Sequence, residues 1–183
     1  MRRLLGGLLA ALLLSGCDAS SPGSDPPIVQ TILFEVEYVN FAWVPTWQGL
    51  YIDRQGSVYR YDLSDEDTMP VPRETYTEEE LLEKYSHHKE RIGQVDAEVL
   101  ATHYALIRAA GEGALSEPVY RCADAGVVAF RAFRYDATTE HYTPVLLQQE
   151  GDVAQANRSA SAQALVSWLR TVDEQFSNPL CPP

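Results

Sequence analysis

Two segments of the sequence each contain a pair of strand-forming runs joined by a short turn. In residues 48–62 the turn spans Asp53 to Gly56, with Asp opening the turn and Gly supplying the positive φ. In the second segment, residues 126–135 and 141–150 flank a five-residue connection. Strands joined by hairpins pair antiparallel and need no helical crossover. The sequence therefore predicts an antiparallel sheet and excludes a β-α-β alternation.

A further strand is predicted at the start of this domain. Residues 28–40 alternate from Ile32 onward between a face of aliphatic and aromatic side chains and a face that carries Glu35 and Glu37. A period of two with carboxylates opposite apolar groups is typical of a half-buried strand.

Three helices are predicted from their capping residues. Thr77 and Glu80 form a capping box, Asp96 caps a helix from about Ala97 to Ala110, and Asn157 or Ser159 caps the last helix. Leu81, Tyr85, His88 and Ile92 mark one stripe of the first helix, although His87 and His88 are expected to be a solvated pair at its end. The buried face of the second helix is expected to hold Val99, Leu100, Tyr104, Leu106 and Ile107, and Ala162, Leu165, Leu169, Val172 and Phe176 lie at helical spacing in the last. The predicted class is α+β: one antiparallel sheet, made of the N-terminal strand plus two hairpins, with about three helices packed mainly on one face.

The N-terminal 17 residues, MRRLLGGLLAALLLSGC, form a different kind of segment. Arg2 and Arg3 precede an apolar run that is too short for a bilayer core, which takes about 20 residues, but suits a signal peptide. The run ends in Leu14-Ser15-Gly16-Cys17, which resembles the lipobox of bacterial lipoproteins. The resemblance implies cleavage before Cys17 and a diacylglycerol on its sulfur. The alternatives are an ordinary cleaved signal or a short buried helix.

The predicted organisation has three parts: a lipoprotein signal peptide (1–16), the lipidated Cys17 with a flexible tether (17–27), and a single globular domain (28–183). The tether contains no large apolar side chain, and its ten residues after the cysteine span at most roughly 35 Å. The resemblance places the domain on a bacterial membrane, facing the periplasm or the cell exterior. Asp18 after the cysteine slightly favours the inner membrane.

The charge of the chain excludes two kinds of partner. With 14 basic against 26 acidic residues, the formal charge is −12, and it becomes −14 once the signal peptide with its two arginines is removed. Nucleic acid binding depends on Lys and Arg, so no nucleic acid partner is expected. Anionic headgroups would also repel this surface, so attachment to a membrane must come from the lipid.

The two cysteines beyond Cys17 are candidates for a disulfide. An exported protein meets an oxidising compartment, so Cys122 and Cys181 are expected to pair, with two unpaired thiols as the alternative. The bridge would close a loop of about 60 residues and contribute roughly 4 kcal/mol in the chain-entropy model.

Motifs that would indicate catalysis are missing from the sequence. It contains no GxSxG elbow, no phosphate-binding loop, no GxGxxG and no HExxH. Adjacent residues such as His87 and His88 point about 100° apart on a helix, which does not suit a shared metal. The sequence predicts no catalytic residue, no cofactor and no metal site, and it favours a role other than an enzyme.

Aromatic residues supply the candidate binding surface. Trp43 and Trp47 lie in a connection that contains Pro and Gly, and Tyr51, Tyr59 and Arg60 extend the possible patch onto the first hairpin. Exposed rings of this kind stack on sugars or anchor protein partners. The alternative is that both tryptophans close one end of the core.

The function predicted from these features is a lipid-anchored protein of the bacterial cell envelope that acts by binding a protein or a cell-wall glycan. Two alternatives remain open: an envelope hydrolase with a dispersed active site, and a purely structural envelope lipoprotein. The mature domain itself resembles no known family.

Overall fold

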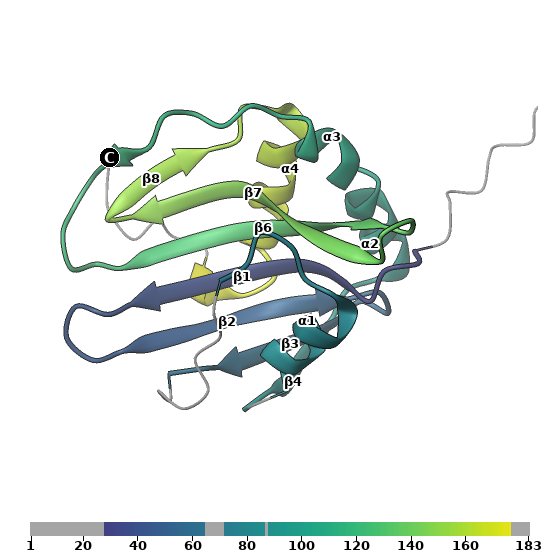
Figure 1. The fold of residues 1–183 in the computed structure, drawn as a ribbon, viewed down its shortest axis with the longest axis horizontal. Helices are drawn as coiled ribbons and strands as arrows, with labels where there is room; N and C mark the ends of the chain where they lie inside the picture. Colours follow the sequence, from purple (N-terminus) through teal and green to yellow (C-terminus); the bar gives the residue numbers. More distant parts are fainter. Residues whose placement is uncertain (1–27, 65–71, 87, 177–183) are drawn as a thin grey trace, which may run out of the picture.

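The computed structural model describes residues 28–64, 72–86 and 88–176 of the 183-residue chain. Within these residues, eight strands form one antiparallel sheet in the order β4-β3-β2-β1-β6-β7-β8-β5 (Figure 1). The strands are β1 (Ile32–Asn40), β2 (Thr46–Asp53), β3 (Ser57–Asp62), β4 (Glu90–Gln94), β5 (Val119–Tyr120), β6 (Val127–Asp136), β7 (His141–Gly151) and β8 (Val153–Ala156). The α+β class, the N-terminal strand and both hairpins are confirmed.

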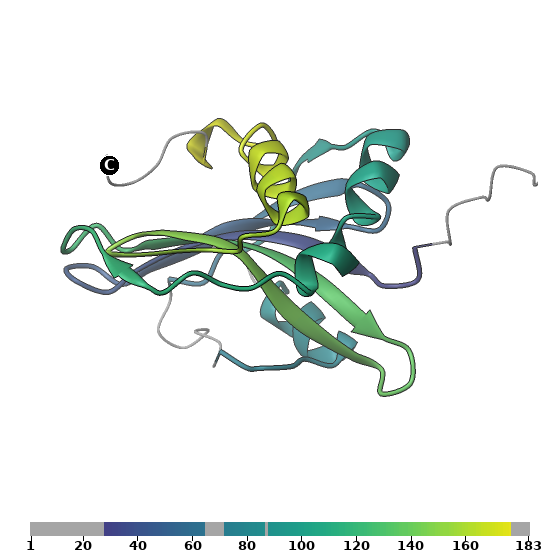
Figure 2. The ribbon, with the colours of Figure 1, turned by 90° about the horizontal axis from the view of Figure 1, so that it is seen from above.

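Helices cover both faces of the sheet. They are α1 (Glu78–Lys84), α2 (Ala97–Tyr104), α3 (Ile107–Gly111) and α4 (Ala160–Leu169), with a short 3-10 turn at Glu174–Phe176. Figure 2 shows α2 and α4 on one side of the sheet and α1 on the other. The larger core joins one face of the sheet to α2, α3 and α4, and a smaller, aromatic core lies on the α1 face. The expectation of about three helices mainly on one face agrees with this arrangement.

The predicted caps are present. Thr77 accepts a hydrogen bond from the Glu80 backbone while the Glu80 carboxylate accepts one from the Thr77 N–H, which completes the capping box. Asp96 caps α2, and Ser159 rather than Asn157 caps α4. The local signals at these positions therefore located the helix starts.

The predicted helix lengths were wrong in three places, one of which is α4, which ends at Leu169 although its predicted stripe extended to Phe176. The first helix ends at Lys84 instead of reaching Ile92, because His88 has a left-handed backbone (φ 46°) and the chain then pairs with β3 as the edge strand β4. The second helix divides into α2 and α3 after Tyr104, and Val99 is exposed although it was expected to be buried.

Strand β1 also differs from its prediction, since it is buried on both faces. It lies at the centre of the sheet between β2 and β6. The second hairpin ends at Gly151, where the backbone (φ 110°) turns the chain into an additional strand, β8, which widens the sheet beyond β7. Phe34 and Val36 face the larger core, while Ile32 joins the aromatic core after a register shift between Ile32 and Phe34. The carboxylates of β1 consequently face α1 and not solvent.

Candidate functional site

Glu35 and Glu37 lie two residues apart on β1 and therefore point to the same face of the sheet, toward α1. Their exposed fractions are only 1% and 5%. Two carboxylates removed from water at such close spacing must be compensated by cations and hydrogen-bond donors. The compensating groups come from four other elements of the fold.

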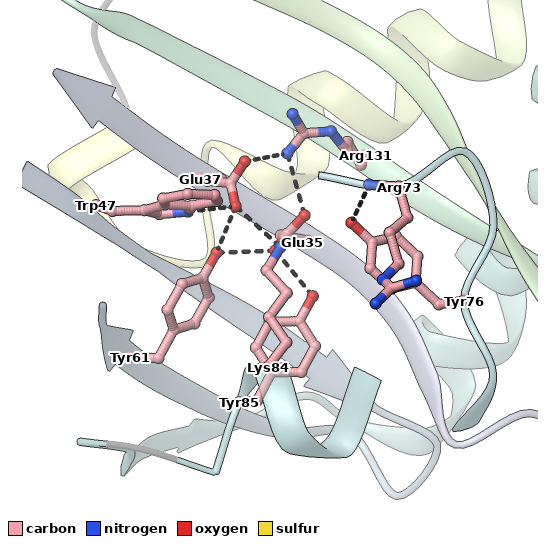
Figure 3. A network of polar contacts seen from close by, with 9 residues as sticks. All are labelled: Glu35, Glu37, Trp47, Tyr61, Arg73, Tyr76, Lys84, Tyr85 and Arg131. Atoms are coloured by element: carbon pink, nitrogen blue, oxygen red, sulfur yellow. Dashed lines mark hydrogen bonds and ion pairs between the residues drawn. The ribbon is translucent and has the colours of Figure 1, made fainter. Parts of the chain in front are cut away.

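Two cations bridge the pair of glutamates (Figure 3). Lys84, in the last turn of α1, donates from Nζ to Glu35 Oε1 at 2.5 Å and to Glu37 Oε2 at 2.9 Å. Arg131 stands directly opposite Glu35 on β6 and donates from Nη1 to Glu35 Oε2 at 3.1 Å and to Glu37 Oε1 at 2.6 Å. The four side chains, called the carboxylate cluster below, carry no net charge.

Three uncharged donors complete the carboxylate cluster. The Tyr61 and Tyr85 hydroxyls each donate to Glu35 Oε1 at 2.8 Å, and the Trp47 indole N–H donates to Glu37 Oε2 at 2.7 Å. Among the described residues, every buried polar side-chain atom has a hydrogen-bond partner. A buried polar network that is fully satisfied fixes its members in one geometry.

Gly49 makes room for this arrangement. It lies on β2 between Glu37 and Tyr61 in the register of the sheet. A Cβ at this position would collide with the Val36 carbonyl oxygen and would lie 2.7 Å from the Tyr61 hydroxyl. The missing side chain therefore allows the tyrosine to reach the carboxylates.

The surroundings set the ionisation of the carboxylate cluster. Burial alone would raise the pKa of Glu37, but the charges of Lys84 and Arg131 and the hydrogen bonds from Lys84 and Trp47 lower that pKa from 4.5 to about 2. Burial would lower the pKa of Lys84, but the two carboxylates raise it. Burial and the neighbouring Glu35 raise the pKa values of Tyr61 and Tyr85 well above 10. At neutral pH Glu37 is thus a carboxylate, and it is a poor proton donor for general acid catalysis.

A cavity of about 550 Å³ opens beside the carboxylate cluster on the α1 face. The chain before α1 crosses this face as residues 72–76 (Figure 1). Two backbone hydrogen bonds join Tyr76 to Tyr142 of β7. Most of the lining side chains are apolar: Val39, Phe41, Trp47, Pro72, Tyr76, Val127, Phe133, Pro144 and Leu146. The polar lining consists of the carboxylate cluster together with Arg73, Glu74 and Gln149. Concave, mostly apolar sites of this size with a few polar groups are typical of small-molecule binding.

The five residues of the predicted aromatic patch do not form one surface. Trp43 is 82% exposed in the loop between β1 and β2, whereas Trp47 is 7% exposed and lines the cavity. Tyr51 is buried on the α1 face and stacks on Tyr59 at 5.0 Å. Arg60 points to the opposite face, where it pairs with Asp173. Only Trp47 joins the candidate site.

The cysteine predictions fall partly outside the described residues. Cys17 and Cys181 are not described, so lipidation and the bridge from Cys122 to Cys181 stay predictions. His87 also lies outside the described residues, and in the described ranges no group of three or more His, Cys, Asp or Glu side chains is placed to hold a metal ion.

Comparison of this chain with protein-family models, with curated proteins and with solved structures finds no match. None of the described helices is both long and apolar enough to span a bilayer. The function is therefore argued from the site itself.

Replacing Lys84 with methionine tests how strongly the carboxylate cluster is coupled to the fold. This change leaves two buried carboxylates with one cation, and we expect the free energy of unfolding to fall by about 3–5 kcal/mol in chemical denaturation. Arg108→Met is the control, because the Arg108 side chain is 89% exposed and pairs with Glu112 on the surface. It should change stability little. Equal stability of Lys84→Met and the unmodified protein would contradict the charge assignment.

Proposed function

We propose that this protein is a lipid-anchored lipoprotein of the bacterial cell envelope that binds a ligand in the cavity beside the carboxylate cluster. The observation that carries the proposal is the cavity of about 550 Å³, with apolar walls and with Arg131 in its polar lining. The first 17 residues supply the expected anchor through Cys17, and the tether would hold the domain within roughly 35 Å of the membrane. The domain then faces the periplasm or the cell exterior, and Asp18 slightly favours the inner membrane.

The rigidity of the cavity supports a binding role. Its floor is the central strand β1, and the side chains of Glu35, Glu37 and Arg131 are locked by charged hydrogen bonds. Its outer wall is tied to β7 at Tyr76. A site that is already ordered loses little conformational entropy when a ligand enters, so more of the contact energy becomes affinity.

The paired carboxylates do not favour the hydrolase alternative. A glycosidase-type pair needs one carboxyl group that holds a proton near neutral pH. Glu37 has its pKa lowered to about 2, and both glutamates are buried under bridging cations. We therefore assign the carboxylate cluster to the architecture of a binding site.

Membrane attachment has a direct test. Cys17→Ala should abolish incorporation of a labelled acyl chain, because the thioether linkage needs the cysteine sulfur. Cys122→Ala is the matched control and should keep the label. Acyl labelling of Cys17→Ala at the level of the unmodified chain would refute the lipobox interpretation.

Ligand binding can be tested by placing a photoreactive benzoylphenylalanine at Leu146, which lines the cavity, in the full chain expressed in cells. We expect light to add a discrete mass to the chain, measured by mass spectrometry after detergent extraction. The same residue at Leu115, which is exposed and does not line the cavity, is the control.

The proposal predicts a product specific to position 146. Identical products at both positions, or none at position 146, would contradict binding in the cavity and would favour the purely structural alternative. Turnover of an envelope substrate by the purified chain would favour the hydrolase.

A further inference from the structure

The chemistry of the cavity also indicates what kind of molecule fits it, an inference that rests on the binding function proposed above. Glu35 and Glu37 line the cavity but are almost fully buried, so a ligand cannot reach their oxygens. Lys84 is buried as well and is committed to both carboxylates. Arg131 is therefore the main polar group on the cavity floor that a ligand can contact.

Arg131 keeps part of its donor capacity. Its side chain is 26% exposed and lines the cavity. Only Nη1 donates to the glutamates, and within the described part of the chain Nη2 and Nε have no protein acceptor. Figure 3 shows these two nitrogens turned away from the carboxylates. A ligand must supply a hydrogen-bond acceptor at this point, since a guanidinium has donors and no acceptor.

The charge of the surroundings favours an uncharged acceptor. Lys84 and Arg131 balance Glu35 and Glu37, so the floor has no net positive charge. At the mouth, Arg73 is paired with Glu80 at 3.2 Å, while Glu74 adds a negative charge. A carboxylate or phosphate ligand would bring a further negative charge into a neutral to acidic site.

The apolar walls favour a ligand without N–H groups. Among the described lining residues, few side chains, such as Gln149 and Glu74, offer acceptors for the amide N–H groups of a peptide. Buried donors without a partner are costly. An ester presents a carbonyl acceptor and no donor, and its hydrocarbon chain gains from burial against walls such as Phe133 and Leu146.

We infer that the cavity binds an uncharged fatty-acyl ester, with the hydrocarbon chain along the apolar walls and the ester carbonyl accepting a hydrogen bond from Arg131. A membrane-tethered domain has such esters within its reach. No covalent step is involved, and the ligand leaves unchanged.

The test uses membranes that carry the full chain and a photoreactive probe, the methyl ester of a diazirine-bearing decanoic acid. Labelled peptides are mapped by mass spectrometry and normalised to label on bulk lipid. We expect the ester to label the segments that contain Phe133 and Leu146, and methyl decanoate to displace it. The free acid should label these segments about tenfold less, because of the added charge.

Variants separate the cavity from general membrane proximity. Leu146→Trp should fill the cavity and remove the label, whereas Leu115→Trp, outside the cavity, should leave it unchanged. Arg131→Lys keeps the positive charge beside the glutamates but removes the guanidinium fork. It should raise the concentration of methyl decanoate needed for half displacement by about tenfold.

Three results would overturn the inference: equal cavity labelling by the acid, label that persists in Leu146→Trp, and displacement at lower concentration by the blocked peptide acetyl-Leu-Leu-amide. The proposed ligand class and the proposed binding function can be rejected by different results. Absence of ester labelling together with a product specific to position 146 in the benzoylphenylalanine experiment would reject the ester and leave the binding function intact.

Discussion

Two glutamates buried on the central strand of the sheet impose the main constraint on this structure. Glu35 and Glu37 would be very costly to bury alone, so the fold must bring cations to them from α1 and β6. This links the sheet to α1, which also packs on it through the buried Leu81 and a cluster rich in aromatic side chains. The lowered pKa of Glu37 means that its contribution to stability is present above pH 4.5, the ordinary pKa value, and is lost as the pH falls toward 2.

The same constraint shapes the cavity. Because Nη1 of Arg131 is held by both carboxylates, the other edge of its guanidinium is fixed in position next to apolar walls. One oriented guanidinium edge in such surroundings selects for an acceptor on an otherwise apolar molecule. The stability of the fold and the recognition of a ligand thus depend on the same ion pairs. Although the whole chain is acidic, the two carboxylates on the cavity floor are balanced by Lys84 and Arg131.

Local signals in the sequence were sufficient to predict much of the fold but little of the candidate site. The capping box at Thr77 and the turn at Gly56 depend on neighbouring residues only, so they could be predicted. The carboxylate cluster joins residues that are 47 to 96 positions apart, and its formation depends on the pairing of β1 with β6. The alternation around Glu35 suggested a solvent-facing side. A partial signal was present, since Arg131 lies between the apolar residues Phe130 and Ala132, but its partner could not be identified without the register.

The ionisation of Glu37 in the folded protein is the most direct test of this account. Carbon-13 NMR of the side-chain carboxyl carbons reports each glutamate separately, and the Glu37 resonance is assigned by its loss in Glu37→Gln. The account predicts that this resonance does not shift while the folded protein is taken through pH 4.5, because its pKa lies near 2. A titration midpoint near 4.5 in the folded protein would contradict the account, since it would mean that Lys84 and Arg131 do not hold the carboxylate in its charged form.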